Sequence, residues 1–263
     1  MNDILILGAG GHGRVILDIL RQARQATPVG FLDNNPAIHG RRVDGLPVLG
    51  GIEKLDELHA AGTTAAVIAI GDNGVRRQLG EIVERAGMTL PAVIHPSAQI
   101  ATNAHIGKGV VIAAGALVCA HCQVGDYAIL NTGCIVDHES MIGTAAHICP
   151  GVRLAGHVTV ESGAFIGIGA TVIQNVRIGF EAIIGAGAVV TRDVDPMTTV
   201  VGVPARAVKD APSPDEFAAL LGRPMTITTP IAVLRAARPH GDPERADALS
   251  HTDARDPMRV SSK

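Results

Sequence analysis

Residues 130–154 read LNTGCIVDHESMIGTAAHICPGVRL, and an aliphatic side chain recurs in this stretch at every sixth position. The period continues in both directions without insertion, from Ile94 to Val190. Four positions after each aliphatic residue stands a small or β-branched residue, such as Cys134 after Leu130. A fixed short period is typical of a repeat architecture. A period of six fits neither the 3.6 of a helix nor the two of a flat strand.

This period predicts a parallel β-helix in which three hexads close one coil of a triangular prism. The aliphatic residue fills the interior and the small residue fits the corner, and the 17 hexads give nearly six coils. Glycine is expected to supply unusual backbone angles at many of the turns. The glycines in question are Gly107, Gly125, Gly143, Gly167, Gly179 and Gly185.

Residues 1–90 show a different pattern, in which short apolar runs alternate with stretches of helical spacing. The expected strands are 4–7, 29–32 and 67–70, and the expected helices are 14–26 and 74–86. Alternation of this kind indicates a parallel sheet with helices on its faces. We therefore predict a small α/β Rossmann-like domain over 1–90, an all-β β-helix domain over 91–209, and a tail over 210–263. The tail contains seven prolines and many charges, and we expect most of it to be poorly ordered.

Bulk composition excludes several classes of function. The net charge is −3, and acidic and basic residues are interspersed along the chain. The sequence therefore has no basic patch of the kind that binds nucleic acids. No apolar run approaches the ~20 residues of a membrane span, and the first residues lack the basic region of a signal peptide. The cysteine pair Cys119 and Cys122 has no second pair, so we expect reduced thiols, no metal site and a cytoplasmic protein.

The turn after the first expected strand reads Gly8-Ala9-Gly10-Gly11-His12-Gly13. It satisfies the dinucleotide pattern G-x-G-x-x-G, and Asp33 follows 20 residues after Gly13 as a candidate ribose-binding acid. Glycines at such a turn let helix N-terminal amides approach a phosphate. However, residues 1–90 are long enough for only about one of the two mononucleotide-binding halves that make up a dinucleotide-binding domain. The open interpretations are a nucleotide-linked substrate, NAD, or a turn with a purely structural role.

Together these segments resemble the hexapeptide-repeat acyltransferases, and within them the bacterial sugar acetyltransferases that modify nucleotide-linked amino sugars and their relatives in sialic acid O-acetylation. The resemblance rests on the period of six, on the fused glycine-rich turn, and on the end motif at 201–206, and it covers roughly residues 3–209. It implies a left-handed β-helix, a homotrimer, and acetyl-CoA as a co-substrate rather than a permanently bound cofactor.

The same resemblance assigns roles to particular residues. The segment 131–139, NTGCIVDHE, resembles the family's catalytic segment. It makes His138 the general base, Glu139 the residue that raises its basicity, and the Gly156 amide the donor to the thioester oxyanion. Histidine suits this task because its unperturbed pKa of about 6.5 lets it accept a proton near neutral pH. The implied substrate contacts are Gly10, Gly11, His12, Asp33, Asn34 and Gly71, and the implied acetyl-CoA contacts are His147, Ile168 and Ala186.

We therefore predict an acetyl-CoA-dependent N-acetyltransferase acting on the amine of a nucleotide-activated amino sugar. The alternatives are a sugar O-acetyltransferase on the same scaffold and a non-catalytic β-helix scaffold protein. Direct attack by the amine needs no covalent enzyme intermediate, so Cys134 and Cys149 are read as packing residues. A structural turn histidine is the competing interpretation of His138.

The expected trimer also predicts a buried surface. The positions just before the aliphatic series point outward, and every third of them shares one face of the prism. Five of the six side chains on one such face are large and apolar, which is unusual for a solvated surface. We expect a trimer of threefold symmetry to bury this face, whose residues are Val93, Val111, Ile129, His147, Phe165 and Ile183.

Overall fold

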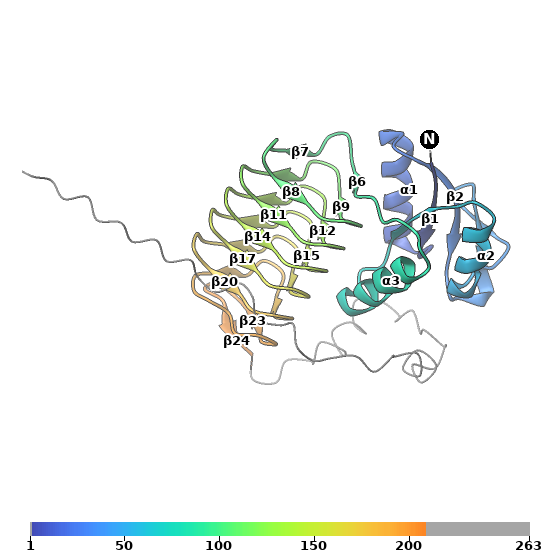
Figure 1. Cartoon of the computed structure of the whole chain (residues 1–263). Helices are drawn as coiled ribbons and strands as arrows, with labels where there is room; N and C mark the ends of the chain where they lie inside the picture. Colours follow the sequence, from blue (N-terminus) through green and yellow to red (C-terminus); the bar gives the residue numbers. More distant parts are fainter. Residues whose placement is uncertain (1, 209–263) are drawn as a thin grey trace, which may run out of the picture. The chain divides into compact units, whose positions relative to one another are not determined.

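The computed structural model describes residues 2–208, and the expected tail at 210–263 lies outside the described residues. The chain begins with an α/β segment (Figure 1). Its elements are β1 (Asp3–Leu7), α1 (Gly11–Ala23), β2 (Thr27–Leu32), the 3-10 turn η1 (Pro36–Ile38), β3 (Arg42–Val43), β4 (Leu46–Gly50), the 3-10 turn η2 (Ile52–Lys54), α2 (Leu55–Ala60), β5 (Ala65–Ile68) and α3 (Asn73–Arg85).

The sheet of this segment has the strand order β3-β4-β2-β1-β5, and β4, β2, β1 and β5 run parallel. β1 is apolar on both faces, with Ile4 through Leu7 buried, because helices cover the sheet. The predicted Rossmann-like fold is confirmed. Helix α1 begins at Gly11, three residues before the predicted start. The β3–β4 hairpin and α2 were not predicted, because their segments show no clear hydrophobic period in the sequence.

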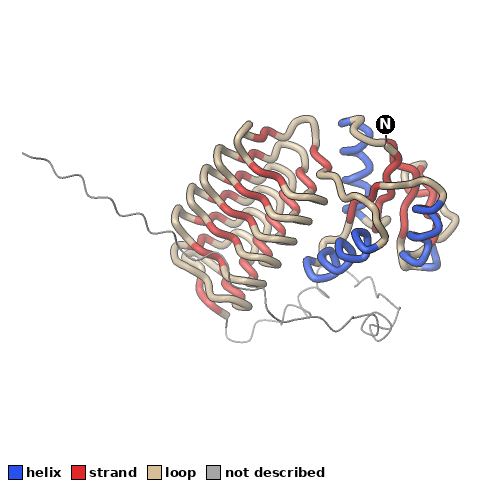
Figure 2. The backbone as a smooth tube through the Cα atoms, viewed as in Figure 1, coloured by secondary structure: helices blue, strands red, loops and turns tan. Residues whose placement is uncertain are grey.

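The rest of the described chain is a left-handed parallel β-helix, in which the strands are short and separated by tight turns (Figure 2). The first face contains β6 (Val93–Ile94), β9 (Val111–Ile112), β12 (Ile129–Leu130), β15 (His147–Ile148), β18 (Phe165–Ile166), β21 (Ile183–Ile184), β23 (Thr199–Val201) and β24 (Arg206–Ala207). The second face contains β7 (Gln99–Ile100), β10 (Leu117–Val118), β13 (Ile135–Val136), β16 (Arg153–Leu154), β19 (Thr171–Val172) and β22 (Val189–Val190). The third face contains β8 (His105–Ile106), β11 (Gln123–Val124), β14 (Met141–Ile142), β17 (Thr159–Val160) and β20 (Arg177–Ile178).

The register confirms the period of six. From β6 to β19 each strand pairs with the strand three further along the chain, so paired residues are 18 apart, as with Leu130 and Ile148. Aliphatic positions such as Leu130 and Val136 are fully buried, and so are small-residue positions such as Cys134 and Ala146. The hexad therefore sets both the coil length and the filling of the interior.

The predicted reason for the turn glycines is wrong. The left-handed backbone angles recur every six residues, but two positions after those glycines, for example at Gly109 (φ 63°) and Ala145 (φ 54°). The turn glycines themselves allow close stacking of successive coils. A Cβ atom on Gly143 would lie 2.4 Å from the backbone nitrogen of Ser162 in the next coil. Lack of a side chain, rather than left-handed geometry, is what the fold requires there.

The predicted trimer surface is also wrong, because the chain covers most of that face itself. Val93, Val111 and Ile129 are almost completely buried in one cluster with residues of β1 and α1, including Ile4 and Ile16. The apolar character of the first face therefore reflects packing against the α/β segment of the same chain. Within residues 2–208, no helix is long and apolar enough to cross a lipid bilayer.

Candidate active site

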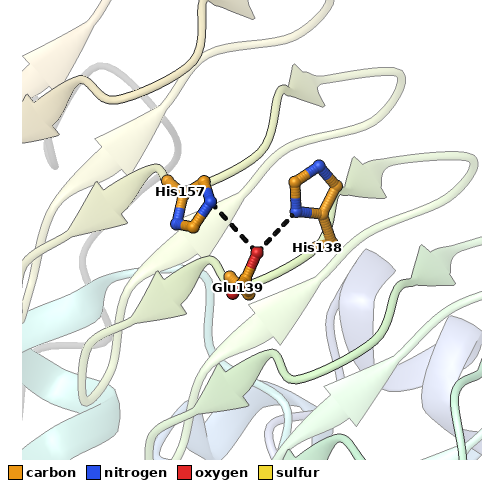
Figure 3. Close-up of side chains that lie close together, drawn as sticks. All are labelled: His138, Glu139 and His157. Carbon is orange, nitrogen blue, oxygen red and sulfur yellow. Dashed lines mark hydrogen bonds and ion pairs between the residues drawn. The ribbon is translucent and has the colours of Figure 1, made fainter. Parts of the chain in front are cut away.

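His138 lies in the turn between β13 and β14, at the corner between the second and third faces of the prism. Its Nδ1 atom is 3.0 Å from Oε2 of Glu139, and both side chains are about half exposed, at 52% and 49% (Figure 3). The backbone N–H of His138 donates to Oδ1 of Asp137 at 2.7 Å. Asp137 thus holds the backbone of His138 and Glu139 holds its ring, while the ring stays accessible.

The His138–Glu139 hydrogen bond determines which nitrogen can act as a base. The hydrogen bond from His138 is the main factor that lowers the pKa of Glu139, so this carboxylate is ionised at neutral pH. An ionised carboxylate only accepts hydrogen bonds. Nδ1 of the neutral ring must therefore carry the proton, which leaves the lone pair on Nε2 free to accept one.

His157 is a further member of this cluster, which the sequence alone did not single out. Its Nε2 atom lies 3.0 Å from the same Oε2 of Glu139, and its ring meets that of His138 edge to face at 5.4 Å (Figure 3). His157 follows Glu139 by 18 residues, so it stacks directly on Glu139 in the next coil. That separation was readable in the sequence once 18 was recognised as the coil length.

Left-handed backbone angles recur at this corner in non-glycine residues. His121, Glu139, His157 and Asn175 occupy successive coils and all have left-handed angles, with φ between 57° and 61°. The same position at the corner between the first and second faces holds glycine in the five coils from Gly115 to Gly187. Left-handed angles in non-glycine residues are costly and collect at functional sites. The corner that carries His138 therefore has polar side chains where glycine would be less strained.

Gly156 lies one coil after His138 and is packed against its ring. A Cβ atom at Gly156 would be 2.6 Å from both Cε1 and Nε2 of His138. The N–H of His157 donates to the carbonyl of His138 at 2.9 Å, which joins the two turns. Glycine is required here for the ring to keep its position, and Gly156 is close to the nitrogen that would accept a proton. Its predicted role as oxyanion donor stays a prediction.

The glycine-rich turn has two kinds of glycine. Gly10 and Gly11 are exposed at the N-terminus of α1, and a Cβ atom at either would meet nothing within 4 Å. Gly71, after β5, is equally open. At Gly13, by contrast, a Cβ atom would lie 2.2 Å from the carbonyl oxygen of Gly8, so this glycine allows the helix to pack on the strand. The open glycines are those that were predicted to contact a substrate.

The carboxylate of Asp33 has a structural role that the sequence did not reveal. It accepts hydrogen bonds from the backbone N–H groups of Ala9 at 2.8 Å and Asn35 at 2.9 Å, and the residue is buried. Oδ1 of Asn34 accepts from the N–H of Ile52 at 3.0 Å. Both side chains hold loops at the carboxyl ends of the strands, and their predicted contacts with a substrate stay predictions.

His12 and His147 form a buried polar group beside Gly71. Burial lowers the pKa of His12 to about 4 and that of His147 well below its usual value, and the Arg76 charge lowers both further. Nε2 of His12 and Nδ1 of His147 have no well-formed hydrogen bond among the described residues, although the Gly71 backbone is near enough to raise the pKa of His147. Both rings are therefore neutral.

Arg76 anchors this region, and no pattern in the sequence had pointed to it. The side chain is fully buried on α3, where its pKa falls to about 9 chiefly through burial. Its Nε and Nη2 atoms donate to the carbonyls of Tyr127 and Ala145 in the prism, each at 2.7 Å. Its Nη1 atom donates to the carbonyls of Ile70 and Gly71, at 2.9 and 3.0 Å. The guanidinium thus ties the Gly71 loop to two coils of the β-helix.

The three residues predicted to line acetyl-CoA do not lie together in one chain. His147 is buried on the first face, where its ring packs edge to face on Phe165 at 5.3 Å. Ile168 and Ala186 are exposed and stack in successive coils at the corner between the first and second faces. This corner is at the opposite edge of the second face from His138.

The cysteines are free thiols, and the two near the candidate site are unsuited to covalent catalysis. Burial raises the pKa values of Cys134 and Cys149 to about 12. A thiol is nucleophilic as the thiolate, and neither residue forms a thiolate at neutral pH. Covalent catalysis by either thiol is therefore disfavoured.

Comparisons with known proteins identify the family to which the chain belongs. The model of the PglD N-terminal domain matches residues 3–83. The crystal structure of the perosamine N-acetyltransferase PerB from Caulobacter crescentus, in complex with CoA and GDP-perosamine, is 39% identical and has a TM-score of 0.76. The alignment covers 79% of this chain and 98% of that one. Structures of its variants with a histidine replaced by asparagine or alanine have also been solved.

Two further relatives are also acetyltransferases. The acetyltransferase domain of PglB from Neisseria gonorrhoeae FA1090, in complex with acetyl coenzyme A, is 34% identical with a TM-score of 0.75, over 79% of this chain and 100% of that one. The UDP-N-acetylbacillosamine N-acetyltransferase of Bacillus subtilis (strain 168) is 34% identical over 115 residues, which are 43% of this chain and 52% of that protein. The match thus spans about half of the curated relative.

The fold and the comparisons together define a β-helix acyltransferase. The chain belongs to the hexapeptide-repeat sugar N-acetyltransferases that carry a PglD-type N-terminal domain.

Proposed function

We propose that this protein transfers the acetyl group of acetyl-CoA to the amine of a nucleotide-activated amino sugar. The observation that carries the proposal is the 3.0 Å hydrogen bond between His138 and Glu139, which leaves Nε2 of His138 with a free lone pair. The substrate amine attacks the acetyl carbonyl as Nε2 takes its proton. A C–N bond forms, the C–S bond breaks, and the proton passes to the departing thiolate of coenzyme A.

The acceptor is assigned to the α/β segment, which corresponds to the proposed domain at residues 1–90. Gly10 and Gly11 stand open at the N-terminus of α1, where backbone N–H groups favour a phosphate. Gly71 and the neutral ring of His12 border the same region. Asp33 and Asn34 hold its loops. Support for a nucleotide sugar also comes from the Caulobacter relative, whose structure contains GDP-perosamine.

The donor is assigned to the prism, which corresponds to the proposed domain at 91–209. Ile168 and Ala186 form an exposed edge suited to contact acetyl-CoA, and a relative at 34% identity binds acetyl coenzyme A. This edge and the His138 corner bound the second face on opposite sides. We therefore infer that the donor edge of one chain meets the His138 corner of another, and that the protein is a homotrimer with three equivalent sites.

The second face is the surface we assign to this assembly. It presents the partly exposed apolar side chains of Leu117, Ile135 and Val189, whereas the first face is covered by the protein's own chain. An open groove of about 540 Å³ on the third face includes none of the predicted site residues. Four cysteines without a disulfide support a reducing, cytoplasmic location.

The proposal is tested by incubating the full chain with acetyl-CoA and a panel of GDP-, UDP- and dTDP-linked amino sugars. Release of coenzyme A is followed with a thiol reagent, and the product is identified by mass spectrometry. We expect one nucleotide amino sugar to be acetylated on nitrogen, and the matching hydroxyl sugar to be inert. Acetylation of the hydroxyl sugar alone, or tight binding of NAD without any acetyl transfer, would overturn the proposal.

A further inference from the structure

The His138 corner brings together three metal-ligating atoms. Nδ1 of His138, a carboxylate oxygen of Glu139 and Nε2 of His157 all lie within 4.8 Å of one another (Figure 3). Two of the three separations are 3.0 Å. All three side chains are about half exposed, so a fourth ligand from water has access.

We propose that these three residues bind a divalent transition metal ion of the Zn²⁺ class, and that the bound ion inhibits the enzyme. Two imidazoles and one carboxylate form a ligand set that zinc uses in three-ligand sites with an open fourth position. Zinc bond lengths of about 2.0–2.2 Å imply ligand atoms about 3.3 Å apart in a tetrahedron. The observed separations of 3.0 Å are close to this spacing.

The backbone favours such a site because it holds the ligands on rigid coils. His138 and Glu139 are adjacent, and His157 stacks on Glu139 through the coil repeat, with the N–H of His157 donating to the carbonyl of His138 at 2.9 Å. Glu139 and His157 both keep strained left-handed backbone angles. The ligands are therefore preorganised, and binding an ion requires little rearrangement of the chain.

Inhibition follows from the tautomer of His138 and rests on the proposed function. The base keeps its proton on Nδ1 and uses the lone pair of Nε2. A metal ion needs the lone pair of Nδ1, so the ring proton moves to Nε2 when the ion binds. Nε2 then becomes a hydrogen-bond donor with no lone pair for the substrate proton. The change involves no oxidation or reduction, and chelation of the ion reverses it.

His121 provides a matched control. It stands one coil before Glu139 at the same turn position, is exposed, and also has a left-handed backbone angle (φ 59°). Its Nε2 atom instead lies 3.1 Å from Nδ2 of Asn103. His121→Asn and His157→Asn thus remove equivalent side chains from the same column, and only the second removes a proposed ligand.

The test begins with Co²⁺, which reports four-coordinate binding by its visible absorption, titrated into the full chain without substrate. We expect one ion per chain. His157→Asn should weaken binding by at least ~10-fold, since even second-shell changes cost 10–100-fold in metal affinity, and His121→Asn should leave it unchanged. Equal binding by wild type and His157→Asn would overturn the site, as would a thiolate-to-Co²⁺ charge-transfer band that places the ion on Cys119.

The second measurement is acetyl transfer in the presence of Zn²⁺. Wild type and His121→Asn should lose activity on Zn²⁺ addition and regain it with a chelator, while the rate of His157→Asn, measured relative to its own rate without metal, should not respond to Zn²⁺. If Co²⁺ binds as described and Zn²⁺ does not slow wild type, the inhibitory role is overturned. If no amino sugar is acetylated at all, the proposed function fails, and the Co²⁺ titration still decides the metal site.

Discussion

Gly156 is stacked one coil after His138, and a single Cβ atom on this glycine would lie 2.6 Å from the ring atoms Cε1 and Nε2. The position of the imidazole therefore depends on the absence of a side chain in the next coil. Since the backbone of Gly156 does not require left-handed angles, a substitution there acts mainly through this contact.

Gly156→Ala should reduce kcat because the added methyl group displaces the ring of His138 from its hydrogen bond with Glu139. We expect a loss of at least about 10-fold and at most the ~10²–10⁴-fold that a positioned base supplies, with the fold retained. The measurement is kcat for Gly156→Ala in the wild-type and His138→Ala backgrounds. Independent, multiplicative losses in the double variant would contradict a role through His138, since residues that act together are non-additive.

Gly11→Val should raise the KM for the nucleotide sugar strongly and leave the KM for acetyl-CoA nearly unchanged. Gly11 is open, so the valine fits the fold but blocks the approach of phosphate to the N-terminus of α1. Gly13→Val is the contrasting variant, because its Cβ atom would collide with the Gly8 carbonyl and destabilise the protein. Steady-state kinetics with each substrate varied in turn provides the check. A rise in both KM values would argue against the assignment of the acceptor to this turn.

The protein should lose stability in mild acid because His12 stays neutral in the fold. Its folded pKa of about 4 lies below the unfolded value of about 6.5. The unfolded state thus binds more protons, and the free energy of unfolding falls as pH decreases from about 6.5 towards 4, by up to about 3 kcal/mol. His147 acts in the same direction.

His12→Gln should flatten this pH dependence, and the same change at the exposed His105 should not. Urea denaturation at pH 7 and pH 5 measures the difference. Identical losses of stability in wild type and His12→Gln would show that His12 is protonated in the folded protein.

Ile135→Arg should dissociate the proposed trimer, because it places a charge on the second face. Ile129→Arg, by contrast, should destabilise the monomer, since Ile129 is fully buried within the chain. Light scattering and thermal unfolding separate the two effects. A wild-type protein that is monomeric at micromolar concentration, or an Ile135→Arg variant that remains trimeric, would contradict the assembly.

The sequence predicted the β-helix well because its period is strictly local: each hexad repeats the same burial and the same turn. It did not show what covers each face. Val93, Val111 and Ile129 looked like an intermolecular surface, yet they pack on α1 and β1, which are distant in the sequence. Arg76 was not identified for the same reason, because its partners Tyr127 and Ala145 belong to remote coils.

The members of the His138 cluster differ in how readily the sequence shows them. His138 and Glu139 are adjacent and were paired by the family resemblance, and a hydrogen bond joins them in the structure. His157 reaches the same carboxylate only because one coil contains 18 residues. Asp33 fits a ligand-binding motif in the sequence. Its two hydrogen bonds to the backbone N–H groups of Ala9 and Asn35 are seen only in the three-dimensional structure, which brings the loops after β1 and β2 together.

The most direct test of the central claim is the turnover of His138→Ala with acetyl-CoA and the nucleotide amino sugar that the wild type acetylates. If Nε2 of His138 takes the proton of the attacking amine, kcat should fall by about 10²–10⁴-fold, with the affinity for both substrates and the thermal unfolding temperature preserved. Glu139→Gln should cost less, because it weakens the orientation of the base without removing it. A His138→Ala variant that keeps the wild-type rate at neutral pH would contradict the account.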